Sequence, residues 1–450
     1  MSESNFSRRK FLTNVAAAGA VGAVGMNLLS SCTGGEAKKV IKTPEELKLP
    51  PMLDTAPDGP VLKAGLIGCG GRGSGAMIDF LNAGPNLVIH AMGDVLEDRV
   101  KDCRNTLKKQ KNMEVADENV FIGFDAYQKV IDSGVDVVLL ATPPYFRPLH
   151  VEAAVQARKH VFMEKPVAVD ADGVRSLLAS AKKADSLGLK TAAGTQRRHE
   201  FSYVDIFTQV ANGAIGDIVS ANCYWNGGQL WYRTPQKGWS EMEYMIRDWV
   251  NWTWLSGDHI VEQHVHNLDV IHWFTGKYPV KAVGFGSRQR RVTGDQYDNF
   301  SIDYTFDNGM HMHSMCRQIS GCVDNISEFI MGTKGYTNCC SYIKDLNGTD
   351  VYKYALPKDE QGKDIKKHGP YVEEHVNLVT CIRKDIPFNE IETVAKSTLV
   401  AIMGRVSAYT GKETTFDEIL NSNLKLGPKV FVMGPVDIPD KGVIPVPGKA

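Results

Sequence analysis

Apolar runs of strand length alternate with helical patterns of apolar residues over residues 61–195. One run, VDVVLLA at 135–141, is apolar throughout, as expected for a central parallel strand buried on both faces. The predicted strands lie at 64–68, 87–92, 135–141, 160–163 and 191–193. The predicted helices lie at 76–81, 150–158 and 171–186. This alternation predicts a right-handed, doubly wound parallel sheet.

After Gln196 the pattern changes to a period of two residues. Alternating apolar and polar positions at 218–224, 300–306 and 310–315 predict an antiparallel sheet with one covered face. A long helix is predicted later, at 391–409. The chain is therefore expected to form an α/β domain followed by a second domain built mainly on an antiparallel sheet.

The first predicted strand runs into the sequence G-C-G-G-R-G at 68–73. Glycines at this spacing allow a tight turn, close approach of a pyrophosphate, and packing of the next helix on the strand. Backbone N–H groups at the helix N-terminus then hold the phosphates. Asp94, about 20 residues further on at the end of the second strand, can accept hydrogen bonds from both ribose hydroxyls and would repel a 2′-phosphate. The pattern predicts a dinucleotide site that favours NAD(H) over NADP.

The carboxyl ends of parallel strands form the ligand-binding edge of such a sheet. Thr142 and Pro143 follow the strand at 135–141, and Glu164, Lys165 and Pro166 follow the strand at 160–163. The predicted cofactor-binding residues are Gly68, Gly70, Gly71, Arg72, Gly73, Asp94, Thr142, Pro143, Glu164 and Lys165.

The composition of the 450-residue chain is that of an ordinary soluble globular protein. Hydrophobic residues make up 43% and charged residues 23%, which suits two or three domains with a substantial core. The formal net charge of -1 gives no overall field toward nucleic acid or an anionic membrane. The nine cysteines form neither a disulfide framework nor a zinc-binding pattern.

The first 32 residues indicate export. Residues 7–12, SRRKFL, resemble the twin-arginine signal, and the weakly apolar stretch at 15–29 is too short and glycine-rich for a stable transmembrane helix. Residues 29–32, LSSC, resemble a lipoprotein box in which Cys32 is acylated; ordinary cleavage nearby is the alternative. We expect a periplasmic protein that touches the membrane only through its signal peptide or a lipid anchor. The twin-arginine route exports folded proteins, so a tightly bound cofactor can be loaded before export.

Four motifs occur in the order found in one family. They are the glycine turn, Glu164-Lys165-Pro166, the GAIG sequence at 213–216, and a predicted helix at 262–273 carrying His266 and Asp269. Over about residues 61–420 the chain resembles the Gfo/Idh/MocA oxidoreductases. The resemblance implies a Rossmann domain and then an α+β domain with a large, open, mostly antiparallel sheet. It also implies action on sugars or cyclitols, and homo-oligomers, dimers or tetramers, formed through that sheet.

These observations divide the chain into five parts. They are a signal peptide at 1–32, a linker or arm at 33–60, an NAD-binding domain at 61–195, a substrate and oligomerisation domain at 196–390, and a returning helix with a C-terminal tail at 391–450.

The predicted catalytic residues are Lys165, His266 and Glu262. In the family that the chain resembles, the lysine of the E-K-P motif hydrogen-bonds the reacting hydroxyl near the nicotinamide. Glu262 and His266 are four residues apart in a predicted helix and would share one face. The resemblance assigns the general base to His266, since histidine accepts protons near neutral pH. It aligns Glu262 with a position where the family usually has aspartate.

Several polar and aromatic residues are predicted to bind substrate. Arg197 and His199 face either sugar hydroxyls or an anionic group, the alternative being a salt-bridge cluster between domains. On a helix, His264 points away from His266, which favours a pocket-wall or packing residue over a metal ligand, and no metal site is predicted. Six of the seven tryptophans lie at 225–254, as expected for a platform for sugar rings or for a subunit interface. The predicted substrate-binding residues are Arg197, His199, Trp231, Tyr232, His264 and Asp269.

The sequence thus predicts an exported oxidoreductase with tightly bound NAD(H). Its reaction would be oxidation of a ring hydroxyl of a sugar or glycoside, such as that at C3, to the ketone, or the reverse. The alternative is a redox-neutral NAD-dependent glycoside hydrolase that oxidises, eliminates, adds water and takes the hydride back. A third class is a sugar-binding protein without catalytic activity, against which the intact Lys165 and His266 argue.

Overall fold

The structure, a computed structural model, describes residues 41–449. The predicted export signal and Cys32 lie outside these residues. Within them, no helix has the length and apolar character needed to cross a membrane.

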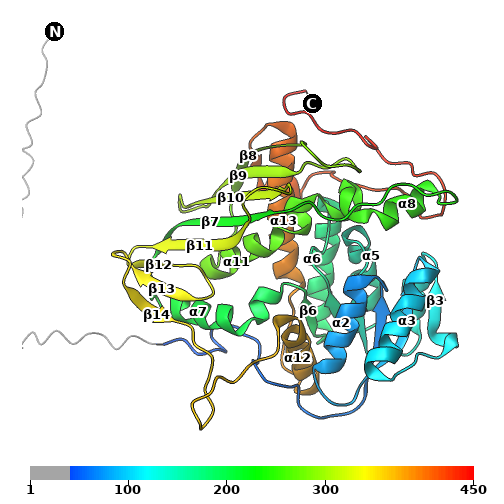
Figure 1. The fold of residues 1–450 in the computed structure, drawn as a ribbon, viewed down its shortest axis with the longest axis horizontal. Helices are drawn as coiled ribbons and strands as arrows, with labels where there is room; N and C mark the ends of the chain where they lie inside the picture. The colour runs from blue at the N-terminus through cyan, green and yellow to red at the C-terminus, as the bar shows by residue number, and fades with distance from the viewer. Residues whose placement is uncertain (1–40, 450) are drawn as a thin grey trace, which may run out of the picture. The chain divides into compact units, whose positions relative to one another are not determined.

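The first domain is built on a six-stranded sheet (Figure 1). Its strands are β1 (Leu62–Ile67), β2 (Leu87–Asp94), β3 (Val120–Ile122), β4 (Val137–Leu140), β5 (His160–Met163) and β6 (Thr191–Ala193). The order is β3-β2-β1-β4-β5-β6, and every pair is parallel. The chain order reverses direction between β1 and β4, the switch point where ligands of such sheets bind.

Helices cover both faces of this sheet. They are α2 (Gly71–Asn82), α3 (Glu97–Lys111), α4 (Ala126–Asp132), α5 (Arg147–Gln156) and α6 (Ala171–Ser186). All four residues of β4 are buried, as the continuous apolar run predicts. Asp170 caps α6 by accepting a hydrogen bond from the Gly173 N–H (2.9 Å), which fixes where that helix begins.

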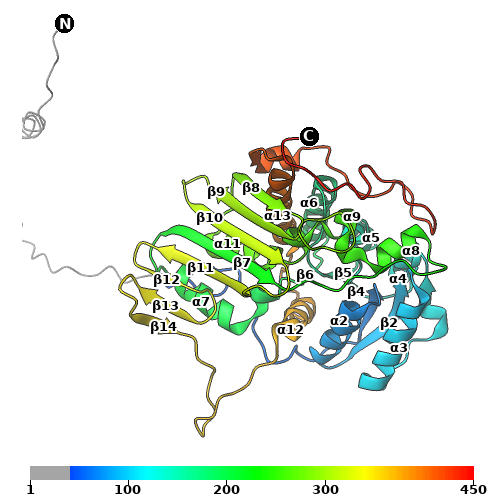
Figure 2. The same ribbon diagram turned by 45° about the horizontal axis from the view of Figure 1, so that its top comes forward.

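The second domain is built on a nine-stranded sheet (Figure 2). Its strands are β7 (Ile218–Gly227), β8 (Lys281–Ser287), β9 (Asn299–Thr305), β10 (His311–Gln318), β11 (Asn325–Gly332), β12 (Gly335–Thr337), β13 (Tyr342–Asp345), β14 (Asp350–Lys353) and β15 (Thr414–Thr415). The order is β14-β13-β12-β11-β7-β10-β9-β8-β15, with β7 and β10 parallel and the other pairs antiparallel. The predicted fold class, a doubly wound parallel sheet followed by a mostly antiparallel one, is confirmed.

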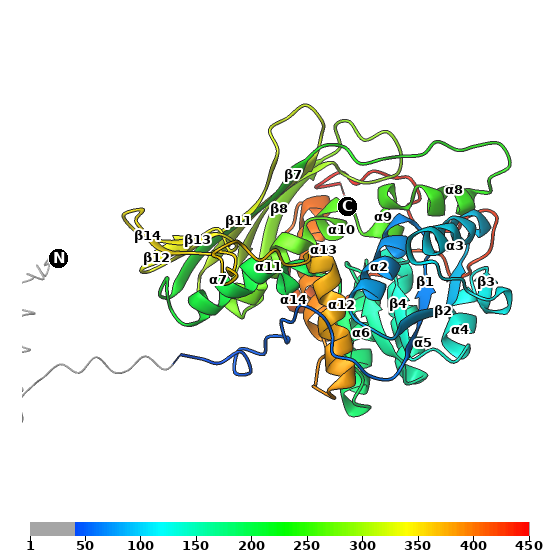
Figure 3. The ribbon, with the colours of Figure 1, turned by 60° about the horizontal axis from the view of Figure 1, so that its bottom comes forward.

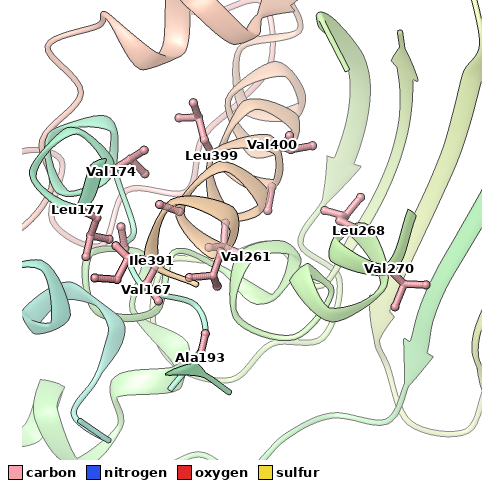
Figure 4. Packing of buried hydrophobic residues seen from close by; sticks show 14 of the residues in the cluster. Val167, Val174, Leu177, Ala193, Val261, Leu268, Val270, Ile391, Leu399 and Val400 are labelled. Atoms are coloured by element: carbon pink, nitrogen blue, oxygen red, sulfur yellow. The ribbon is translucent and has the colours of Figure 1, made fainter. Parts of the chain in front are cut away.

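The remaining helices belong to the second domain and to the part of the chain that returns to the first. They are α7 (Phe201–Ala211), α8 (Glu241–Arg247), α9 (Thr253–Ser256), α10 (His259–Glu262), α11 (Val265–Thr275), α12 (Pro370–Arg383), α13 (Ile391–Thr410) and α14 (Phe416–Leu420). Helix α13 packs against both α6 and α11, and Figure 4 shows Leu399 on the side of α13 that faces Val174 of α6, with Val400 on the other side. Helix α12 packs against α2 and β6, so the chain returns to the first domain before α13 (Figure 3).

Candidate active site

The glycine turn leaves the N-terminus of α2 open. Gly68 has a φ of +96°, and a Cβ on Gly73 would lie 1.8 Å from the Gly68 carbonyl oxygen, so the helix packs directly on the strand end. A Cβ on Gly70 or Gly71 would meet nothing within 4 Å. Gly70 is the N-cap residue, and no side chain caps the helix. Free N–H groups at an uncrowded helix N-terminus fit a pyrophosphate.

A cavity of about 400 Å³ opens in front of this turn. The predicted cofactor residues that line it are Gly68, Gly70, Gly71, Arg72, Asp94, Thr142 and Pro143. Three predicted cofactor residues do not line it: Gly73, which packs α2 against the strand end, Glu164, which pairs with Arg72, and Lys165. The second domain contributes Trp231, Arg233, Ile246 and Trp249 to the lining of the same cavity.

Asp94 lies at the end of β2, in the cavity wall. Its Oδ2 accepts the Cys69 N–H (2.7 Å) and its Oδ1 accepts the Leu96 N–H (2.9 Å). Burial raises the pKa of Asp94, and these two hydrogen bonds oppose that rise. Each carboxylate oxygen accepts about two hydrogen bonds, so half of the capacity is left for ribose hydroxyls.

Arg72 connects the glycine turn to the strand-end motif. Its guanidinium pairs with Glu164 (2.5 Å), Asp79 (3.1 Å) and Glu374 of α12 (3.1 Å). Glu374 has no exposed surface, and burial raises the pKa of its carboxyl well above the usual value. These pairs fix Glu164, the residue that precedes Lys165, beside the cavity.

Lys165 reaches across to the second domain. Its Nζ donates to the main-chain oxygen of Glu262 (2.5 Å) and to Oε1 of the same residue (3.2 Å). The Lys165 and Glu262 side chains are only 10% and 8% exposed. A buried ammonium held on two oxygens of one residue is fixed in position, with one N–H left to donate to a ligand.

His266 lies near this pair. Its ring stacks on Trp225 of β7, with the centroids 5.6 Å apart and the planes at 19°. Among the described residues, its buried Nδ1 has no hydrogen-bond partner. Burial holds the pKa of His266 well below the usual value, and the charges of Lys165 and Arg197 lower it further. The ring is therefore neutral at neutral pH and able to accept a proton.

The prediction of one continuous helix at 262–273 is wrong. The chain forms α10, which ends at Glu262, and α11, which begins at Val265. At the break, the His264 N–H bonds to the carbonyl of His259, five residues earlier, and its ring Nε2 bonds to Ser314 Oγ of β10 (2.7 Å). The contact with the sheet and the Lys165–Glu262 pair override the local helical preference. Glu262 and His266 thus belong to separate helices.

Three residues predicted to bind substrate lie instead in the interior. His264 has no exposed surface and bonds to Ser314. His199 is also fully buried, between Asn377 (2.6 Å) and Glu390 (3.4 Å). Asp269, on α11, binds Arg198 through both oxygens (2.7 and 3.0 Å). His199 and Asp269 thus occupy ion-paired or hydrogen-bonded positions, in keeping with the alternative of a salt-bridge cluster, and His264 occupies the position of a packing residue.

Arg197 does lie beside His266. Its Nη1 pairs with the buried Glu328 (2.7 Å), and its guanidinium lies 5.7 Å from the Trp225 ring centroid. A cation on the aromatic ring that stacks on His266 places Arg197 in the candidate catalytic centre. Within residues 41–449, no group of three His, Cys, Asp or Glu side chains is placed to hold a metal ion.

The tryptophans at 225–254 lie in several different environments. Trp225 stacks on His266, while Trp231 and Trp249 line the cavity in front of the glycine turn. Trp252 and Trp254 are buried in an apolar cluster, and Tyr232 is 46% exposed away from the cavity. A single platform for a sugar ring is therefore not formed.

Sequence reasoning missed Glu374 and the cavity wall formed by Arg233 and Trp249. Glu374 occurs in the sequence P-Y-V-E-E-H at the start of α12. The polar residues of this sequence are typical of an exposed helix face, yet Glu373, Glu374 and His375 are buried. The local sequence does not show whether this helix face is exposed or buried, because its burial results from the packing of α12 against α2.

Comparison with known proteins defines the class. Residues 62–189 match the family model described as "Oxidoreductase family, NAD-binding Rossmann fold" of Gfo/Idh/MocA, and residues 203–337 match that of the "GFO/IDH/MocA C-terminal domain". The two matches together cover more than half of the chain. The chain belongs to the Gfo/Idh/MocA family of oxidoreductases.

Individual relatives agree with this assignment. Inositol 2-dehydrogenase 1 of Saccharopolyspora erythraea is 34% identical over 155 residues, which are 34% of this chain and 44% of that protein. An oxidoreductase domain protein from Kribbella flavida has the same fold, with a TM-score of 0.64 at 18% identity over 80% of this chain and all of that one. Scyllo-inositol dehydrogenase from Lactobacillus casei, solved with NAD(H) and scyllo-inositol bound, gives a TM-score of 0.58 at 18% identity over 79% of this chain and 99% of that one. The sequence match to the first of these relatives spans less than half of its length.

Proposed function

We propose that this protein is an NAD(H)-dependent oxidoreductase that interconverts a ring hydroxyl of a sugar or glycoside, such as that at C3, with the ketone. The observation that carries the proposal is the placement of Lys165 and His266. The lysine lies at the strand end of the NAD-binding domain, held by Glu262, and the neutral histidine lies near it on α11. An acid-base pair beside a dinucleotide cavity is what alcohol oxidation requires.

Each residue has a defined part in this chemistry. His266, whose lowered pKa keeps its ring neutral at neutral pH, accepts the proton of the substrate hydroxyl. The free N–H of Lys165 donates to the same oxygen and stabilises the negative charge that develops on it. Glu262 positions Lys165, and Trp225 positions the His266 ring. A bound nicotinamide supplies the hydride acceptor.

NAD(H) fits the residues that the structure describes. The uncapped N-terminus of α2 and the open Gly70 and Gly71 provide the pyrophosphate site, and Asp94 provides the ribose acceptor. Retention of the cofactor would suit a protein exported through the signal at Arg8 and Arg9, whether released in the periplasm or anchored at Cys32. Association of copies through the open nine-stranded sheet is part of the same proposal.

A panel of inositols, sugars and glycosides tests the proposal. Purified protein is mixed with each compound while the absorbance of bound NADH and the identity of the product are followed. The proposal predicts a ketone product and NADH with at least one compound, and neither with the Lys165→Met variant. Absence of NADH and of any product across the panel would contradict it.

A further inference from the structure

An arm of the second domain forms one wall of the cofactor cavity. The arm, residues 228–252, connects β7 to α9 and carries α8 (Figure 1). Trp231, Arg233, Ile246 and Trp249 of the arm line the same cavity as the glycine turn and Asp94. The wall combines aromatic rings with a cation, since the Arg233 guanidinium lies 5.6 Å from the Trp231 ring centroid and the Trp231 and Trp249 centroids are 6.3 Å apart.

An ion pair fastens the arm to the first domain. Arg247, at the end of α8, donates two hydrogen bonds to the carboxylate of Asp98 on α3 (2.9 and 3.0 Å). Its Nε donates to Glu243 one turn earlier (2.9 Å), which holds the guanidinium in place. A bidentate pair of this kind fixes both distance and orientation.

Apolar contacts and the C-terminal tail add to this attachment. Met245 and Ile246 of α8 are buried in one cluster with Leu96 and Phe146 of the first domain. The C-terminal tail contacts α8 as well. Met242 N–H donates to the Gly434 carbonyl (3.0 Å), Val436 N–H donates to Glu241 (2.7 Å), and Lys441 pairs with Glu241 (2.9 Å). The arm is thus held by both the first domain and the tail.

We propose that the arm is a clamp that retains the cofactor, with Trp231 and Arg233 as cofactor-binding residues supplied by the second domain. This inference rests on the proposed use of NAD(H). Asp94 marks the ribose position, and the arm lines the same cavity beside it, so the arm would contact the adenosine half of the dinucleotide. Aromatic rings stack on a nucleobase and a guanidinium pairs with the pyrophosphate, so the wall matches both parts of that half. Release of the dinucleotide then requires α8 to leave α3.

Adjacent aromatic residues of the arm provide a matched test. Trp231 is 47% exposed and lines the cavity, whereas Tyr232 is 46% exposed and does not. Protein loaded with NADH is mixed with excess NAD, and loss of the bound-NADH fluorescence gives the release rate. We expect Trp231→Ala to release NADH about 10-fold faster, within the range that loss of base stacking gives. Tyr232→Ala should release it at the wild-type rate.

The ion pair is tested in the same assay. Asp98→Ala should speed release by about 2- to 5-fold, the effect of losing a partly exposed pair. Asp117→Ala, which breaks the pair of Asp117 with Arg104 of α3 away from the cavity, should not change it. Equal release rates for Trp231→Ala and Tyr232→Ala would overturn the clamp and leave the proposed function intact. A wild-type protein that binds no nicotinamide nucleotide would overturn both.

Discussion

The ammonium of Lys165 donates to both the main-chain oxygen and the carboxylate of Glu262, which joins the strand-end motif of one domain to helix α10 of the other. The side chain and the main chain of Glu262 each provide one acceptor for the lysine. Glu262 therefore positions Lys165 and defines how the two domains meet at the candidate catalytic centre.

Replacing Glu262 by glutamine tests this role. The Glu262→Gln change keeps the shape and the main-chain acceptor but removes the charge that holds Lys165. A hydrogen bond to a charged group contributes about 1.5–3 kcal/mol, so we expect kcat to fall by about 10-fold or more. Steady-state kinetics on the enzyme loaded with NAD(H) measure this change in kcat. Glu413→Gln, at the exposed pair with Lys281, is the matched control, and an unchanged kcat in Glu262→Gln would refute the positioning role.

Removing the proposed base should separate chemistry from cofactor binding. We expect His266→Ala to lower turnover by about 10²–10⁴-fold, the usual contribution of a general base. The nucleotide content of the purified variant should stay at the wild-type level, since His266 is not part of the cavity wall. Loss of nucleotide together with activity would instead make α11 a structural element of the cofactor site.

The identity of the cofactor follows from Asp94. A carboxylate in the ribose position repels a 2′-phosphate, so nucleotide released from the purified protein should be NAD(H). Mass spectrometry of the released nucleotide measures this directly. Recovery of mainly NADP(H) would mean that Asp94 does not face the ribose.

His264 should make stability depend on pH. Burial lowers the pKa of His264 to about 3, whereas its pKa in the unfolded chain is about 6.5. Above about pH 6.5 the ring is neutral in both states and its contribution to stability is complete. As the pH falls toward 3, only the unfolded chain binds the proton, so the free energy of unfolding decreases by about 1.4 kcal/mol per pH unit.

Denaturant unfolding at about pH 6 and about pH 4 measures this contribution. Between these two pH values, the free energy of unfolding should decrease less in His264→Gln than in the wild type. The difference should equal the contribution of the one proton that His264 binds in the unfolded chain. The same substitution at His313, which is exposed on β10, is the control. Equal pH dependence in His264→Gln and the wild type would contradict the assignment.

Local pattern predicted much of the fold and part of the site. Helix α6 and strand β6 have the predicted bounds, because apolar periodicity and the Asp170 cap are local signals. The glycine turn and Asp94 were placed correctly for the same reason, since their spacing lies within one β-α-β unit. Residues whose role depends on contacts between distant segments could not be predicted from the sequence. The break before α11 depends on Ser314, and the buried state of Glu374 depends on the docking of α12.

We propose that Lys165 and His266 assist oxidation of a ring hydroxyl by an NAD that stays bound to the protein. The most direct test of this proposal is the stoichiometry of the reaction when the loaded protein is mixed with excess glycoside and no second substrate. We expect each protein molecule to complete one turnover and to end with one bound NADH and one ketosugar. Continued release of free sugar and aglycone without accumulation of NADH would contradict it and identify a redox-neutral glycoside hydrolase.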